Sequence, residues 1–246
     1  MNRAGTEVDA VGGRFKFGNR LLDGLPLEAR MALEPHLHTE TPSVQNVLAE
    51  PRRRAEAAYF PLHCVASLVT VMRDSGSVEV GLVGCDGMLP ISTVLGTNAS
   101  TQRAIVVIAG MAVAIKGDDL RLLMKTHPAI GRALLCYAQT VFDQAAQLAA
   151  CNRLHLLEER CARWLLMAHD RIQHSEIRIT QEMLATALGV HRPGVTVAAQ
   201  ALQAKGLIAY RHGTVAVLNR KRLEAAACEC YGSIMADYAR LVGTPA

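Results

Sequence analysis

Apolar residues recur at helical spacing in two short segments between residues 179 and 206, with a glycine between them. Thr180 is placed to cap the first helix, Gly189 breaks it, and Pro193 suits the first turn of the second helix. The apolar faces are formed by Met183, Leu184, Ala187 and Leu188 in the first segment and by Val195, Ala198, Ala199 and Leu202 in the second. This pattern predicts two packed helices joined by a tight turn.

Two short β-rich runs follow Gly206, which ends the second helix. Residues 207–210 and 214–218 flank Arg211, His212 and Gly213 and predict a hairpin, which would add a wing to the helix pair. A helix-turn-helix unit lays its second helix in the DNA major groove. The segment therefore predicts a DNA-binding domain.

The chain before residue 117 has mostly the periodicity of strands. A helical start over residues 21–37 precedes six expected strands, with a turn at 74–76 and a hairpin around Ala109 and Gly110. The expected strands span residues 44–48, 58–61, 65–72, 78–83, 104–108 and 111–116. Short strands at this spacing indicate an antiparallel roll or small barrel with a concave pocket.

A long helix is expected after Pro128, and its apolar positions recur in steps of three or four. These positions are Ile130, Leu134, Tyr137, Val141, Ala145 and Leu148. They suit either a dimer seam between two copies of the helix or a helix buried against its own roll, and the spacing does not separate the two. A second helix, over residues 156–172, carries Trp164 into the core of the DNA-binding domain.

The chain after Leu218 adds a further helix, whose one face carries Leu223, Ala227, Cys230, Ile234, Tyr238 and Leu241. This helix would brace the DNA-binding domain or add dimer contacts. The predicted organisation is α+β: a flexible tail (1–17), a sensory β-roll (18–126), a connecting or dimerisation helix (127–155), a winged helix-turn-helix domain (156–222) and a C-terminal helix (223–246).

Charge supports DNA binding independently. The 246-residue chain has a net charge of +4, while residues 160–222 contain eight Arg and two Lys against three acidic residues, a net of +7. The seven cysteines include no Cys-x-x-Cys pair, and the single residue between Cys228 and Cys230 is a short spacer for a zinc knuckle, so no metal site is expected. No signal peptide or membrane span is evident, which favours the cytoplasm and no membrane partner.

The order of roll, long helix and winged helix-turn-helix resembles the cyclic-AMP receptor and fumarate-nitrate regulator (Crp/Fnr) family of bacterial transcription factors. The most specific likeness lies in residues 179–182, 188–192 and 202–208, and the resemblance extends loosely from Phe17 to Leu223. It implies a homodimer that binds a near-palindromic promoter site in double-stranded DNA under the control of a signal at the roll. The sequence contains no pattern that marks a contact with RNA polymerase, so this partner stays open.

The resemblance also implies which side chains meet DNA. Arg192 falls on the family's recognition-helix arginine, which would donate to guanine N7 and O6, the alternative being a phosphate contact. Thr196 and Gln200 could reach bases or phosphates, and His191 would cap the helix or contact phosphate. Contacts with the DNA backbone are expected from Thr180, Gln181, Arg211 and His212. Pro193 and Val197 depart from the family pattern, so the operator should differ from the family consensus.

The sensor departs further from the family. Cyclic-nucleotide-binding members carry a Gly-Glu-Leu motif followed by a phosphate-binding arginine, whereas the corresponding residues here are Asp86, Gly87, Met88 and, in approximate register, Arg103. Met88 replaces the ribose-binding Glu, and Ala145 and Ala146 replace adenine-binding hydroxyls, which argues against cyclic AMP because its polar groups would be left unpaired. The first cysteine is Cys64, which argues against an N-terminal iron–sulfur cluster, and a lone His63 is weak support for haem.

No catalytic motif is evident: the chain has no phosphate-binding Gly-rich loop, Gly-x-Ser-x-Gly elbow or His-Glu-x-x-His sequence. The sequence therefore predicts a regulator with no assigned cofactor, and not an enzyme. Two alternatives stay open. The roll could bind a cyclic nucleotide after all, or the basic wing could dock a protein without specific DNA binding.

Overall fold

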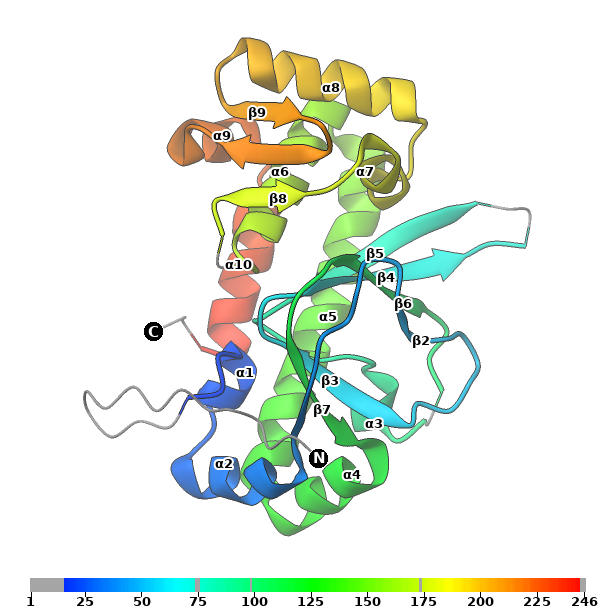
Figure 1. The fold of residues 1–246 in the computed structure, drawn as a ribbon, viewed down its shortest axis with the longest axis vertical. Helices are drawn as coiled ribbons and strands as arrows, with labels where there is room; N and C mark the ends of the chain where they lie inside the picture. The colour runs from blue at the N-terminus through cyan, green and yellow to red at the C-terminus, as the bar shows by residue number, and fades with distance from the viewer. Residues whose placement is uncertain (1–15, 74–75, 98, 173, 244–246) are drawn as a thin grey trace.

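The computed structural model describes residues 16–73, 76–97, 99–172 and 174–243 (Figure 1). The predicted tail, 1–17, and the turn at 74–76 lie almost wholly outside the described residues. Three short elements replace the single helix predicted over residues 21–37, namely α1 (Arg20–Asp23), α2 (Leu27–Leu33) and the 3-10 turn η1 (Glu34–His36). The break falls at Leu25, because a residue before proline is disfavoured in helical conformation.

Two antiparallel sheets form the roll, as the alternating pattern predicts. One has the order β1 (His38–Glu40), β7 (Ala112–Lys116), β3 (Ala57–Pro61). The other has the order β2 (Val47–Ala49), β6 (Arg103–Ile108), β4 (Val65–Val71), β5 (Ser77–Val83). The predicted hairpin around Ala109 and Gly110 is wrong, because β6 and β7 belong to different sheets. The chain crosses between the sheets at Gly110, where a Cβ would lie 2.5 Å from the carbonyl carbon of His63.

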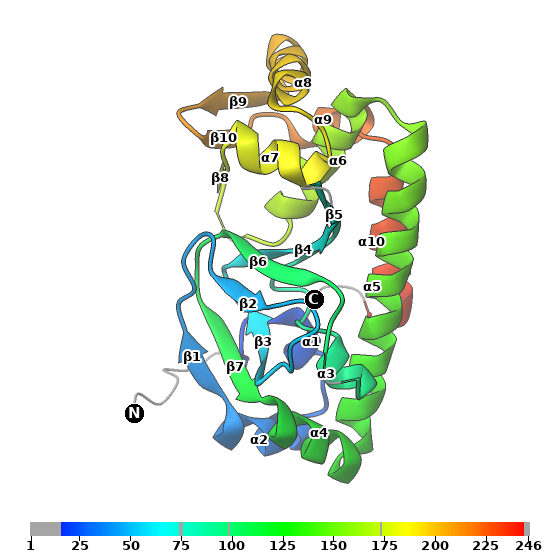
Figure 2. The same cartoon turned by 90° about the vertical axis from the view of Figure 1, so that its right-hand side faces the viewer.

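Three helices follow or interrupt the strands: α3 (Ser92–Leu95), α4 (Gly117–Thr126), which the strand pattern did not predict, and α5 (Pro128–Leu154), which the pattern did predict. Helix α5 runs along the side of the molecule from the roll to the upper domain (Figure 2). Four of the six predicted seam residues, Ile130, Leu134, Tyr137 and Leu148, are buried within this one chain, and Val141 and Ala145 are half-buried. The dimer seam predicted at these positions is therefore wrong, because this face of α5 covers its own core.

The upper domain is a winged helix-turn-helix. It contains α6 (Leu157–His169), β8 (Glu176–Arg178), α7 (Gln181–Leu188), α8 (Arg192–Ala204), β9 (Ile208–Arg211) and β10 (Thr214–Val217). The wing has a third strand that the sequence did not indicate, because β8 pairs with β10 in the order β8-β10-β9. Trp164 is fully buried and packs in the core of this domain, as predicted.

The predicted C-terminal helix is divided into α9 (Arg220–Ala226) and α10 (Cys230–Leu241), which corrects the expectation of one continuous apolar face. Helix α9 packs against α6 of the DNA-binding domain, as the bracing interpretation expects. Helix α10 instead packs lengthwise against α5 of the same chain (Figures 1 and 2). None of the helices in the described ranges is both long and apolar enough to cross a lipid bilayer.

Candidate DNA-binding surface and the joint beneath it

A groove opens on the upper face of the winged domain, between the start of α7, the helix α8 and the hairpin of β9 and β10. Six of the eight residues predicted to contact DNA line it: Thr180, Gln181, Arg192, Thr196, Gln200 and His212. The other two, His191 and Arg211, are exposed beside it. The structure therefore brings the predicted contact residues to one surface.

Hydrogen bonds fix the shape of this surface. The Thr180 hydroxyl accepts from the Met183 amide at 3.2 Å, so it caps α7 as predicted. The Thr196 hydroxyl donates to Gln181 Oε1 at 2.9 Å, which ties α8 to the start of α7. The wing is held by Tyr210, whose hydroxyl donates to the Ile179 carbonyl at 2.8 Å. These bonds present α8 on a rigid support.

Two side chains at and near the start of α8 bear on DNA contact, and one of them differs from expectation. His191 occupies the N-cap position but makes no capping hydrogen bond, so its predicted capping role is wrong, and its exposed ring leaves only the phosphate role open. Val197 is 67% exposed although it is apolar. An exposed valine on the outer face of the helix offers a methyl surface rather than a hydrogen bond.

The charge argument from sequence needs correction. Arg160, Arg163 and Arg171 are buried, so three of the ten basic residues between 160 and 222 cannot meet phosphate. Arg171 pairs with Asp86 instead. The exposed basic side chains that remain on the domain are Arg178, Arg192, Lys205, Arg211, Lys221 and Arg222.

A buried carboxyl joins the winged domain to the roll. Glu79 of β5 accepts from the Trp164 indole at 2.9 Å and from the Ser67 hydroxyl at 2.7 Å. Burial raises the pKa of Glu79 to about 7, although both hydrogen bonds and the nearby Arg163 and Arg171 charges oppose the shift. Next to it, α7 lies against β5 so closely that a Cβ on Gly189 would fall 2.4 Å from Val78.

A buried ion pair strengthens the same joint. Asp86, in the turn after β5, accepts from Arg171 at 2.6 Å, and both side chains are almost fully buried. The Asp86 carbonyl accepts from the Tyr238 hydroxyl of α10 at 2.7 Å. One short turn of the roll therefore contacts both the winged domain and the C-terminal helix.

The four residues predicted to line an effector pocket do not share one. The Asp86 carboxylate is paired with Arg171. Gly87 packs against Tyr137 so closely that a Cβ on Gly87 would lie 2.0 Å from the Tyr137 hydroxyl. Met88 is fully buried in the core of the roll. Arg103 lies elsewhere and pairs with Glu50 at 3.1 Å. The predicted effector pocket is thus wrong at these residues, because long-range contacts occupy them.

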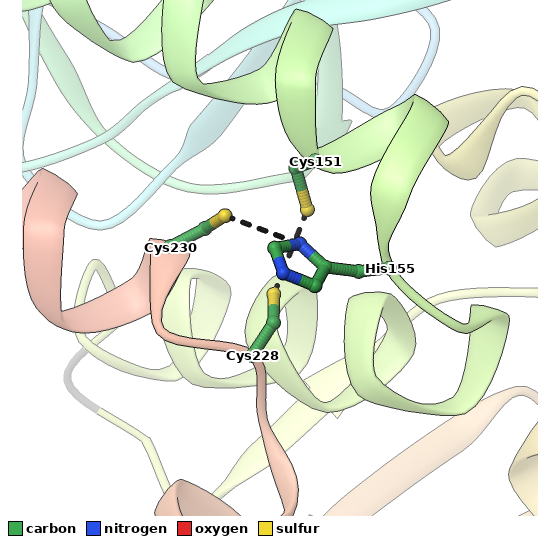
Figure 3. A group of neighbouring side chains, drawn as sticks. All are labelled: Cys151, His155, Cys228 and Cys230. Carbon is green, nitrogen blue, oxygen red and sulfur yellow. Dashed lines mark hydrogen bonds between the residues drawn. The ribbon is translucent and has the colours of Figure 1, made fainter.

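The thiols of Cys64 and Cys85 in the roll are buried. Burial raises the pKa of Cys64 to about 12 and also raises the pKa of Cys85, so neither thiol is activated. Sequence reasoning missed a different group, in which Cys151 and His155 meet Cys228 and Cys230 (Figure 3). The available signal was the Cys-x-x-x-His spacing at the end of the long helix, which places both side chains on one face.

Comparison with known proteins agrees with this architecture. Residues 159–226 match the family model of the Crp-like helix-turn-helix domain. A search of curated proteins finds no match to this chain. Solved structures with the same fold include FixK2 from Bradyrhizobium japonicum, with a TM-score of 0.67 and 14% identity over 78% of this chain and 98% of that one.

Two further structures have similar scores. A transcriptional regulator assigned to the Crp/Fnr family from Eubacterium rectale has a TM-score of 0.63 and 18% identity, covering 84% of this chain and 96% of that one. CLP from Xanthomonas campestris, described as a c-di-GMP responsive global regulator, has a TM-score of 0.61 and 17% identity, covering 79% and 100%.

These matches define the class. Residues 159–226 form a Crp-like helix-turn-helix domain, and the chain shares the fold of a solved Crp/Fnr-family structure and of FixK2.

Proposed function

We propose that this protein is a homodimeric, sequence-specific transcription regulator that acts in the cytoplasm and is controlled by a signal that its roll receives. The groove along α8 carries the proposal, because it gathers six residues expected to contact DNA on one exposed surface. The contacts of Glu79 and Asp86 with the winged domain give a physical route from roll to α8.

Base recognition is assigned to the outer face of α8. Arg192 lies in its first turn, where a guanidinium can donate to both N7 and O6 of guanine. Val197 is also exposed on α8 and fits the methyl group of thymine, which is the apolar group that the major groove offers. Gln200 lies one turn further and has both donor and acceptor atoms.

The dimer is assigned to the face of α5 that the chain itself leaves uncovered. Leu135 and Phe142 are exposed and seven residues apart, and Ala146 and Ala149 continue the same stripe. Steps of four and three residues along a helix form a coiled-coil seam. Phe142 is 68% exposed, and a second copy of α5 would cover it.

Selection of bound sequences from random duplex DNA by the purified protein tests the proposal. We expect a two-fold symmetric motif with half-sites one helical turn apart, about 34 Å. If random and selected duplexes bind equally well in repeated rounds, with and without cell extract as a source of effector, specific DNA recognition is wrong.

Phe142→Glu tests the dimer separately. Two carboxylates facing each other in an apolar seam should shift the protein from dimer to monomer, as measured by light scattering after gel filtration. Leu122→Glu is the matched control, because Leu122 is similarly exposed but lies on α4. If the Phe142→Glu variant remains a dimer, the dimer interface lies elsewhere.

A further inference from the structure

Three cysteines and one histidine converge where α5 ends. Cys151 lies in the last turn of α5 and His155 directly follows that helix, while Cys228 lies in the connection between α9 and α10 and Cys230 begins α10 (Figure 3). The four ligand atoms all lie within 4.8 Å of one another. All three thiols are buried, and the imidazole is half-buried. Segments about eighty positions apart in sequence thus supply one compact set of metal-binding atoms.

The distances match one tetrahedral ion. The Sγ atoms of Cys151 and Cys228 are 3.5 Å apart, and Cys230 Sγ lies 3.4 Å from His155 Nδ1. Zinc bonds of roughly 2.3 Å to sulfur and 2.0 Å to nitrogen place two tetrahedral sulfur ligands about 3.8 Å apart and a sulfur and a nitrogen about 3.5 Å apart. A four-iron cluster would hold its ligands much farther apart, because a cube of iron and sulfide would lie between them.

The surrounding groups suit thiolate and imidazole ligands. His155 presents Nδ1 to the thiols, while its Nε2 lies 3.1 Å from Glu229 Oε2, an arrangement that orients metal-binding histidines in many proteins. The Gln147 amide donates to Cys230 Sγ at 3.1 Å.

The local fold is arranged for this convergence. Two residues separated by one position point to different sides of a helix, so Cys228 and Cys230 could not face one ion within a continuous helix. The chain leaves helical conformation at Ala227, where φ is −83° and ψ is 156°, and α10 starts only at Cys230. The break that the sequence did not predict is what brings both thiols to the same point.

We propose that Cys151, His155, Cys228 and Cys230 bind one Zn²⁺ ion in a closed, structural Cys₃His site. With four protein ligands, the ion has no position left for a substrate. The site joins the end of α5 to the start of α10, beside the loop that leads into α6. Because α10 reaches Asp170 through Tyr231 and Asp86 through Tyr238, the ion sets a helix that touches both the winged domain and the roll.

Metal content of the purified full-length protein is the first test. We expect about one zinc per chain by inductively coupled plasma mass spectrometry, and less than about a tenth of that in Cys228→Ser. Cys136→Ser is the matched control, since Cys136 lies on α5 outside the cluster and its replacement should leave the zinc content unchanged. Equal zinc in all three proteins, iron in place of zinc, or a Cys151–Cys228 disulfide in the wild type found by mass spectrometry would overturn the proposal.

Cobalt substitution tests the ligand set without relying on a variant that loses the site. The wild-type protein reconstituted with Co²⁺ should show intense d–d absorption of a tetrahedral ion and sulfur-to-cobalt charge transfer in the near ultraviolet. His155→Cys should keep the tetrahedral spectrum and increase the charge-transfer band by about one third, because a fourth thiolate replaces nitrogen. Weak bands of an octahedral ion in the wild type, or an unchanged charge-transfer band in His155→Cys, would overturn the assignment.

Discussion

The candidate DNA-contact residues of the winged domain and the candidate effector residues of the roll differ in how well their positions could be predicted from the sequence. On the winged domain, the residues predicted to contact DNA lie together, and all but the half-buried Gln181 and Thr196 are exposed. On the roll, the predicted effector residues are distributed among an ion pair with Arg171, a glycine packed under Tyr137, a core methionine and a surface ion pair. Helical periodicity settles which positions face outward within one element, whereas a pocket in a roll depends on partners far away in the chain.

The comparison has a functional consequence. The turn that resembles the nucleotide-binding motif of related proteins is used here to hold the winged domain against the roll, through Asp86 and Arg171. Under the proposed function, a signal at the roll would act by strengthening or weakening this joint, because a conformational change requires a difference in contacts between two states.

The largest expected effect comes from breaking this ion pair. Asp86→Ala leaves Arg171 buried without its carboxylate, and removal of one partner of a buried pair costs about 3–5 kcal/mol. We expect a loss of this size in the free energy of unfolding, measured by urea denaturation. Asp143→Ala is the control, since Asp143 on α5 accepts from the Gln139 side chain in an exposed hydrogen bond. If both variants lower the free energy of unfolding by the same small amount, the ion pair does not stabilise the joint, and Asp86 is available to bind an effector.

The second effect is a pH dependence at Glu79. Its pKa is about 7 in the folded protein against 4.5 for an ordinary Glu, so folding favours the protonated carboxyl. This stabilisation is complete below about pH 4.5 and is lost as the pH rises through about 7, at a cost of about 3 kcal/mol.

Glu79→Gln keeps the size and hydrogen bonds of the protonated side chain and cannot ionise. We therefore expect the variant to be more stable than the wild type at pH 8 and nearly equal to it at pH 4.5, as measured by unfolding at both values. Glu28→Gln, an exposed change on α2, should show no such difference. A wild-type stability that rises from pH 5 to pH 8 in parallel with that of Glu79→Gln would contradict a buried, protonated Glu79.

Much of the fold could be predicted because its signals are local. Thr180, Gly189 and Pro193 mark the limits of α7 and α8, and the long helix is predicted almost to the residue. The hairpin of β6 and β7 failed, because sequence neighbours entered different sheets at Gly110. The apolar face of α5 was recognised, but the sequence left open whether a second copy or the chain's own roll covers it, since periodicity shows that a face is buried and does not show what covers it.

The joint and the cysteine cluster could not be predicted for the same reason. Glu79 and Trp164 are 85 positions apart, and Cys151 and Cys228 are 77 positions apart. Each half of the cluster carried a weak signal, and only the fold brings the halves together. Burial of three arginines likewise depends on packing that a net charge cannot reveal.

On the DNA-binding side, Arg192→Ala should cost about 1–3 kcal/mol of binding free energy on the selected site and relax the preference at one base pair. Arg192→Lys sharpens the measurement, because lysine keeps the charge but lacks the two-pronged guanidinium. We expect Lys to restore binding to random DNA without restoring the base preference, as measured by competition with single-base variants of the site. If Lys restores both, Arg192 contacts phosphate and the base must be read by another side chain.

The smallest expected effect concerns Arg103, the remaining candidate for a nucleotide phosphate. It pairs with Glu50 on the surface, where the two side chains are 40% and 37% exposed, so Arg103→Ala should change the free energy of unfolding by less than about 1 kcal/mol. Addition of cyclic AMP should leave the Tm of both wild type and variant unchanged, because a ligand raises Tm only when it binds the folded state. A rise in the wild-type Tm that Arg103→Ala abolishes would instead show that the roll binds a cyclic nucleotide through this arginine, with Met88 in the position of the missing carboxylate. The roll would then keep the phosphate contact of the family, and its departures would be confined to the ribose and adenine contacts, at Met88, Ala145 and Ala146.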